Sequence, residues 1–102
     1  MRIRERDLTI PALRAAATKK DGYISTTELI KVLEAEFEPE GEDAEILKNR
    51  NDIKFSQKVR NLVSHRESPD SIFAKGYAEY DEKGKGLKIT DKGRAFLAQV
   101  PA

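Results

Sequence analysis

The sequence predicts an α+β fold in which helices come first and a β-hairpin follows towards the C-terminus. Before Glu67, apolar residues recur at helical spacing in three separate segments. From Phe73 onward the pattern changes to alternation on either side of a glycine-containing turn, which is typical of a hairpin. A capping residue then precedes a last apolar group, which indicates a short terminal helix.

Length and composition indicate one domain, residues 1–102, with a single modest core. The chain is 36% charged and 38% hydrophobic, which suits a globular protein rather than a disordered one. No apolar run reaches the roughly 20 residues needed to cross a bilayer, and "MRIRERDLTI" lacks the apolar centre of a secretory signal. The absence of cysteine excludes disulfides and thiolate metal sites. We therefore expect a cytoplasmic protein with no membrane partner.

The first helix is predicted over Thr9–Lys19. Thr9 is expected to act as its N-cap, and Pro11 falls in the first turn, where a missing N–H does little harm. Its shared apolar face is expected to hold Ile10, Leu13 and Ala17. The segment "KKDGYI" ends the helix, because Gly22 suits a left-handed turn. Residues 23–24 are then expected to form a very short strand.

The second helix is predicted over Thr26–Phe37. Ser25 followed by Glu28 matches a capping box, in which each side chain accepts from the backbone N–H of the other residue. The apolar residues at helical spacing are Leu29, Ile30, Leu33 and Phe37. The segment "EPEGEDAE" then breaks the helix, and residues 38–50 are interpreted as an acidic loop with a helical turn around 44–48.

The third helix is predicted over Asp52–Arg66, with Asn51 or Asp52 as its cap. At 100° per residue, its core-facing stripe consists of Phe55, Val59, Leu62 and Val63. The opposite face consists of Lys54, Gln57, Arg60, Asn61 and Ser64, with Lys58 and His65 flanking it. Pro69 ends the helix, since it disfavours helical geometry at Ser68.

The hairpin is predicted over the segment "FAKGYAEYDEKGKGLKIT". Residues 77–80 alternate after Phe73 in a strand pattern, "DEKGKG" supplies the turn, and "LKIT" is a second strand with Leu87 and Ile89 facing inward. The lysines on or near the hairpin tip are Lys83, Lys85 and Lys88.

The last element is a turn or helix capped by Thr90 or Asp91. Its apolar residues are Ala95, Phe96 and Leu97. The full order is helix, short strand, helix, loop, helix, hairpin, helix. This order predicts a winged helix-turn-helix, with a three-helix core, a C-terminal β-hairpin wing and a short terminal helix. In such a fold the third helix reads DNA.

The charge distribution is uneven although the net charge is only +1. Residues Glu34–Glu45 contain seven acids and no base, and Ile46–Arg66 contain six bases and one acid. Such asymmetry can steer a polyanion onto one face and repel it from another. The alternative is that both segments are ordinary solvated surfaces.

Two segments, "KFSQKVRNLVSHR" and "AKGYAEYDEKGKGLKITDKGRAFL", resemble the winged-helix domain at the N-terminus of Mrr-type restriction endonucleases and related small proteins. Phe55, Val59 and Arg60 match the helix pattern of that family. The positions that match its wing and exit are Lys75, Gly76, Tyr77, Ile89, Thr90, Lys92, Gly93, Arg94 and Phe96. The segments "DLTIPALRAA" and "YISTTELIKVLEAEF" resemble its first two helices, so the likeness covers nearly the whole chain, although many winged helices share the "ITDKGR" exit.

The chain also departs from the family pattern. Its segment "SHRESPDSIFAKGY" is longer between helix and strand, and no nuclease domain follows in the sequence. The resemblance therefore implies a DNA reader without a DNA cutter.

The residues themselves indicate how DNA would be bound. Gln57, Arg60 and Asn61 can make bidentate contacts with adenine or guanine edges in the major groove, and nearby lysines suit phosphates. The predicted DNA-binding residues are Lys54, Gln57, Lys58, Arg60, Asn61, Ser64, His65, Lys83 and Lys85. We expect about five to eight phosphate contacts to double-stranded DNA and steep weakening with salt.

A second hypothesis is a winged-helix protein–protein interaction module that uses its acidic segment to meet a basic partner or to mimic nucleic acid. A homodimer, formed through the first helix or the terminal segment, is compatible with DNA binding. No catalytic residue, metal site or cofactor is predicted. The single histidine, His65, has no nucleophile or second histidine to join, and the acidic loop lacks EF-hand spacing.

Overall fold

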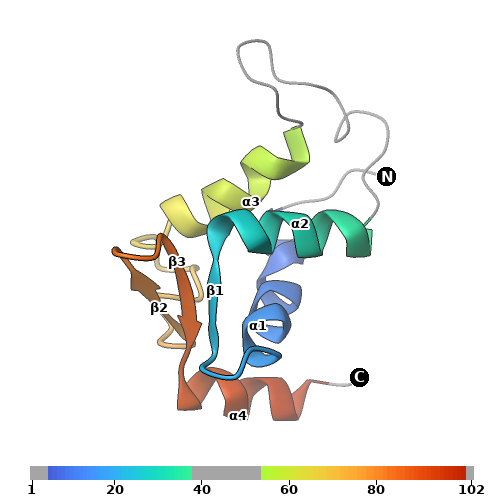
Figure 1. Cartoon of the computed structure of the whole chain (residues 1–102). Coiled ribbons are helices and arrows are strands. Elements are labelled where there is room, and N and C mark those ends of the chain that lie inside the picture. The colour runs from blue at the N-terminus through green and yellow to red at the C-terminus, as the bar shows by residue number, and fades with distance from the viewer. Residues whose placement is uncertain (1–4, 38–53, 101–102) are drawn as a thin grey trace.

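The computed structural model describes residues 5–37 and 54–100 (Figure 1). Its elements, in chain order, are η1 (Glu5–Leu8), α1 (Thr9–Ala17), β1 (Tyr23–Ser25), α2 (Thr26–Phe37), α3 (Lys54–Ser64), β2 (Ala78–Asp81), β3 (Gly86–Ile89) and α4 (Asp91–Gln99). The described residues thus contain four α-helices and a three-stranded antiparallel sheet, which confirms the predicted α+β class. The predicted acidic loop and the predicted caps Asn51 and Asp52 lie outside the described residues.

The sheet has the order β1-β3-β2, so the last strand in sequence is the central one. Ile24 in β1 lies opposite Leu87 in β3, and Ala78 in β2 lies opposite Ile89. Both pairings are antiparallel. The β2–β3 pair is the predicted hairpin, whereas the β1–β3 pair joins a strand near the N-terminus to one near the C-terminus.

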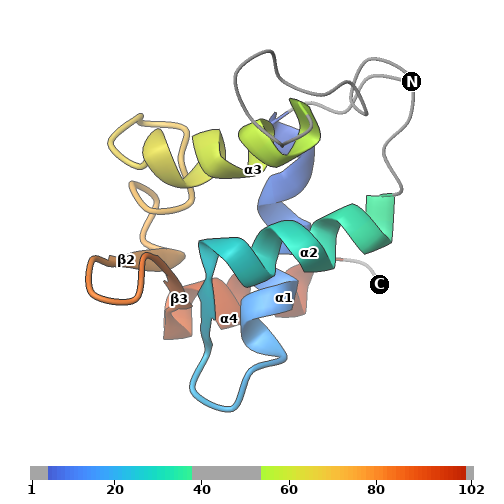
Figure 2. The ribbon, with the colours of Figure 1, turned by 45° about the horizontal axis from the view of Figure 1, so that its top comes forward.

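The core lies where α1, α2 and α3 meet the inner face of the sheet (Figures 1 and 2). Its completely buried large side chains are Leu8, Leu13, Ile24, Leu29, Leu33, Phe55, Val59 and Leu87. Burying each of these from water stabilises the fold by roughly 1.5–3 kcal/mol. The rings of Phe37 and Phe55, 5.9 Å apart, close the contact between α2 and α3. Helix α4 packs across the C-terminal end of α1 (Figure 1).

The start of α1 differs from the prediction. Thr9 is the first helical residue, and the N-cap is Leu8, which forms no side-chain cap hydrogen bond. The 3-10 helix η1 leads directly into α1, so Leu8 already has a helical backbone. Its buried side chain packs in the core and does not cap the helix. The buried face is also shifted, to Ala12, Leu13, Ala15 and Ala16.

Helix α2 has the predicted bounds, and one half of the capping box is confirmed. The backbone N–H of Glu28 donates to Ser25 Oγ at 3.2 Å. The carboxylate of Glu28 instead accepts from Lys19 Nζ at 2.6 Å. The glutamate therefore links the first turn of α2 to the turn that follows α1.

The chain between α3 and β2 forms turns, and the predicted strand begins later than Phe73. Ser71 is buried, its Oγ donates to the carbonyl of Arg66 at 2.7 Å, and it accepts from the N–H of Ala74 at 2.9 Å. These side-chain bonds stabilise a turn instead of an extended backbone. Phe73 consequently packs half-buried against the core, outside the strand.

Within residues 5–37 and 54–100, none of the helices combines the length and the apolar character needed to cross a bilayer.

Thr90 caps α4, as one of the two predicted alternatives. Its Oγ1 accepts from the N–H of Gly93 at 3.0 Å and donates to the carbonyl of Gly76 at 2.6 Å. The single hydroxyl thus joins the start of α4 to the segment that enters β2.

We predict that Thr90→Ala lowers the free energy of unfolding by about 1–2 kcal/mol, because it removes both the cap and the link to Gly76. Urea denaturation followed by circular dichroism measures this change. Thr90→Ser keeps the hydroxyl and serves as the control. If the serine and alanine variants were equally destabilised, the hydroxyl bonds would not be the cause.

Candidate nucleic-acid interface

Helix α3 has two contrasting faces. The predicted stripe of Phe55, Val59, Leu62 and Val63 is buried, at 0–5% exposure. Ser56 is buried as well, because at 100° per residue it lies next to Val63. On the opposite side, the half-buried residues are Gln57, Lys58, Arg60 and Asn61, and the exposed ones are Ser64 and His65. One apolar face thus fixes the rotation of the helix and turns the polar face outward.

Three polar side chains of α3 form a connected ridge. Gln57 Nε2 donates to Asn61 Oδ1 at 2.9 Å, one helical turn away. Arg60 Nη1 donates to Gln57 Oε1 over a longer 3.4 Å. The sequence predicted that each of these side chains can contact a base edge, and the structure adds the hydrogen bonds that connect them. The amide of Gln57 is the centre of the ridge.

The ends of α3 hold two more predicted residues. Lys54 is the first residue of the helix, and its side chain is outside the described part of the chain. His65 directly follows the last helical residue, and its backbone N–H donates to the carbonyl of Asn61 at 2.8 Å. The imidazole is therefore placed at the C-terminal end of the polar face.

The hairpin turn, residues 82–85, is fixed to the start of α2. The carbonyl of Lys85 accepts from both the N–H and the Oγ1 of Thr26, at 3.0 and 2.7 Å. The Tyr23 hydroxyl donates to the carbonyl of Gly84 at 2.5 Å. Lys85 has a left-handed backbone, with φ 52°, which turns its carbonyl towards Thr26. The predicted wing residues Lys83 and Lys85 are both exposed.

The surface of the hairpin carries both signs of charge. A shallow hollow of about 380 Å³ is lined by Glu79, Tyr80, Asp81, Glu82, Lys83 and Lys88. Asp81 Oδ1 also accepts from the N–H groups of Lys83 and Gly84, at 3.0 and 3.3 Å. The wing lysines are thus accompanied by carboxylates, which weakens the local positive potential that the lysine count alone suggests.

Arg66 connects the end of α3 to the hairpin, and sequence reasoning did not include it among the site residues. Its guanidinium carbon lies 4.0 Å from the ring centroid of Tyr80 in β2. Arg66 Nη1 also donates to the carbonyl of Val63 at 3.3 Å. No local pattern could have revealed this pair, since a helix end and a strand are joined only by tertiary folding.

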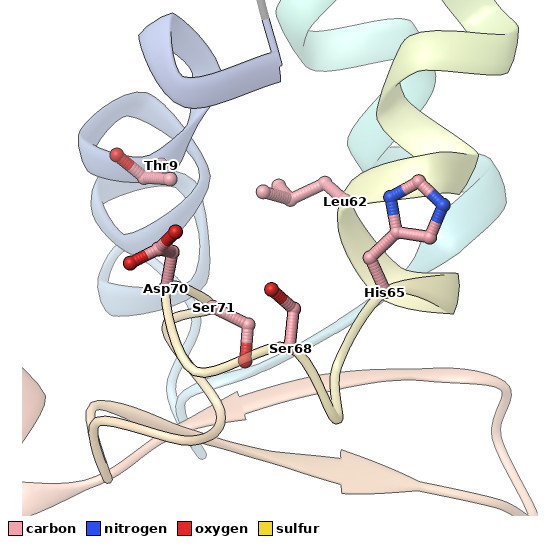
Figure 3. Close-up of a pocket in the computed structure, with 6 residues that line it drawn as sticks. All are labelled: Thr9, Leu62, His65, Ser68, Asp70 and Ser71. Carbon is pink, nitrogen blue, oxygen red and sulfur yellow. The ribbon is translucent and has the colours of Figure 1, made fainter.

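A second, smaller pocket of about 60 Å³ lies beside the end of α3 (Figure 3). It is lined by Thr9, Leu62, His65, Ser68, Asp70 and Ser71. These include the residue types of a hydrolytic triad, but Figure 3 shows His65 and Asp70 on opposite sides of the pocket. The hydroxyl of Ser71 is engaged with the backbone on both its donor and its acceptor side. Among the described residues, no group of His, Cys, Asp or Glu side chains is arranged to hold a metal ion.

No protein-family model, curated protein or solved structure matches this chain. The candidate interface is defined by its own geometry. It consists of the polar face of α3, the exposed lysines of the hairpin turn and the arginine between them.

The hydrogen bond from the Tyr23 hydroxyl to the Gly84 carbonyl connects β1 to the hairpin turn. Burial raises the pKa of the Tyr23 phenol above its ordinary value of 10.0, and the carboxylates of Asp81 and Asp21 raise it further. The neutral phenol therefore donates to Gly84 throughout the physiological pH range. The native state holds this proton more tightly than the unfolded chain does.

We predict that Tyr23→Phe lowers the free energy of unfolding by about 0.5–1 kcal/mol at neutral pH, because it removes one hydrogen bond. Since the native pKa is raised, the stabilisation is complete below pH 10 and declines as the pH rises through the native pKa. The difference between wild type and Tyr23→Phe should thus shrink above about pH 10. Denaturant titrations of both proteins across this range measure it, and a constant difference would contradict the assignment.

Proposed function

We propose that this protein is a winged-helix DNA-binding protein, with α3 in the major groove and the β2–β3 hairpin as a wing on the phosphate backbone. The observation that carries the proposal is the two-faced character of α3. Its apolar side is buried, and its outward side presents a bonded ridge of Gln57, Arg60 and Asn61. Such a helix has the form needed to enter a groove while its domain stays folded.

The arrangement of the elements supports this proposal. A helix, a short strand and two further helices precede the hairpin, and the short strand pairs with the hairpin's second strand. This is the order that the sequence predicts for a winged helix. The resemblance to the N-terminal domain of Mrr-type restriction endonucleases points to the same fold, and it suggests a regulator of transcription or an accessory of restriction or defence.

The chemistry of the ridge supports recognition of base edges. An arginine fork matches the O6 and N7 acceptors of guanine, and the bond from Arg60 to Gln57 limits the directions that the guanidinium samples. Lys58 on the helix, and Lys83 and Lys85 in the turn, suit flanking phosphates. In this proposal the lysines supply binding energy through phosphates, and the ridge on α3 selects the bases.

The alternative function, a protein–protein interaction module, has less support among the described residues. A docking surface of that kind usually shows an apolar patch of several hundred Å². Within the described part of the chain, Val32 is the exposed large apolar side chain, at 39% exposure. A single valine is ordinary for a protein surface. DNA binding is therefore the function that we test.

The test is a titration of a short random-sequence duplex, followed by fluorescence anisotropy, at about 50 and 200 mM salt. We predict that the wild type binds and loses about 10³-fold in affinity over this interval, as expected for roughly six phosphate contacts. We also predict that the double substitution Lys58→Ala and Arg60→Ala lowers affinity at the lower salt by at least about tenfold, because it removes two cations from the proposed interface.

A matched control removes one lysine and one arginine elsewhere. Lys20 belongs to the turn after α1, Arg94 belongs to α4, and both are exposed. That turn and α4 lie at the end of the molecule opposite α3 (Figure 1). The double substitution Lys20→Ala and Arg94→Ala should leave affinity within about threefold of the wild type. Absent or salt-insensitive binding by the wild type would overturn the proposed function, and equal losses in the two double variants would reject α3 as the contact surface.

A further inference from the structure

The side chain of Arg66 is held in place from two directions. Its guanidinium lies over the ring of Tyr80, with 4.0 Å from the central carbon to the ring centroid. One of its N–H groups donates to the carbonyl of Val63 in the last turn of α3. The backbone is fixed as well, because the carbonyl of Arg66 accepts from the hydroxyl of Ser71 at 2.7 Å. This long side chain is therefore ordered before any ligand arrives.

Among the described residues, no carboxylate forms an ion pair with the guanidinium of Arg66. The side chain is half-exposed. A guanidinium has five N–H donors in its plane, and stacking on an aromatic ring covers its face and leaves its edge available. That edge matches the oxygens of a phosphate, which two parallel N–H groups can bind together.

The position of Arg66 is between the two parts of the proposed interface. It follows α3 by two residues, and Tyr80 belongs to the strand that leads into the hairpin turn. Figures 1 and 2 both show the C-terminal end of α3 and the hairpin on the same side of the molecule. A DNA backbone that touches both α3 and the hairpin turn passes this junction.

We infer that Arg66 binds a backbone phosphate of DNA where the strand passes from α3 to the wing, and that Tyr80 is a positioning residue that presents the guanidinium edge-on. This inference rests on the proposed function. It adds a contact whose geometry is set by the tertiary fold, because the guanidinium lies over the ring of Tyr80. Because the ligand is a phosphate, the contact strengthens binding to all sequences equally.

A purely structural role for Arg66 makes a different prediction from a phosphate contact. An arginine that only caps α3 and packs on Tyr80 affects folding, but its removal leaves the salt dependence of DNA binding unchanged. A phosphate contact contributes about 0.9 to the slope of log affinity against log salt. The slope therefore separates the two roles.

The experiment uses the whole chain and two unrelated random-sequence duplexes. The variants are Arg66→Ala, Arg66→Gln, Tyr80→Leu and Tyr80→Phe. Circular dichroism first establishes that each variant is folded at the assay temperature. Arg66→Gln retains most of the stem and an amide donor for the Val63 carbonyl, so it reports on the lost charge even if Arg66→Ala does not fold.

Arg66→Gln is expected to lower the slope by about 0.9, so that between about 50 and 200 mM salt the wild type loses roughly 3.5-fold more affinity than the variant does. The loss should be equal on both duplexes. Tyr80→Leu keeps the charge and should weaken binding by about threefold with a slope close to that of the wild type. Tyr80→Phe retains the ring and should bind as the wild type does.

Two results distinguish failure of this inference from failure of the proposed function. A wild type that binds DNA with steep salt dependence, together with an unchanged slope in Arg66→Gln, overturns the role of Arg66 and leaves the function of α3 intact. A wild type that binds neither duplex overturns both. Losses in Arg66→Gln that differ strongly between the duplexes also reject a phosphate contact, because they indicate base recognition.

Discussion

The pairing of β1 with β3 is the constraint on which the rest of the structure depends. It places Ile24 opposite Leu87, both completely buried, and so joins the strand between α1 and α2 to the hairpin. Gly86 permits this approach, because a β-carbon there would overlap the backbone carbonyl of Ile24. Once the two strands are paired, Lys85 reaches the start of α2 and its carbonyl accepts two hydrogen bonds from Thr26. The hairpin turn is thereby a fixed part of the molecule.

The same core determines what α3 presents to solvent. Phe55 and Val59 are completely buried, and because a helix is rigid in rotation they set the direction of every other side chain on it. The burial of these two residues explains why the polar ridge faces outward, but it does not explain the hydrogen bonds within the ridge. Gln57 connects Arg60 and Asn61 through hydrogen bonds, so the ridge behaves as one unit and not as three separate side chains. Substitutions within it are consequently expected to be non-additive.

The positive charge of the proposed interface is concentrated on α3 and at its C-terminal end rather than on the hairpin. Carboxylates of Glu79, Asp81 and Glu82 share the hairpin surface with Lys83 and Lys88. Arg66, in contrast, stacks on Tyr80 and has no acidic partner among the described residues. In the proposed DNA complex, α3 selects the bases, and the contribution of the hairpin depends on salt and on the position of Arg66.

The sequence by itself determined the elements that depend on local rules. Helical spacing predicted α2 with its observed bounds and the buried stripe of α3, and alternation predicted the hairpin. Thr90, the cap of α4, was one of the two caps that the sequence predicted. Only the tertiary structure decided the unbroken start of α1, the turn around Ser71, the pairing of β1 with β3 and the stacking of Arg66 on Tyr80. The physical reason is the distance along the sequence between the residues that interact. Periodicity and capping involve residues three or four apart, whereas the bond from Tyr23 to Gly84 joins residues 61 positions apart and exists only once the core has formed.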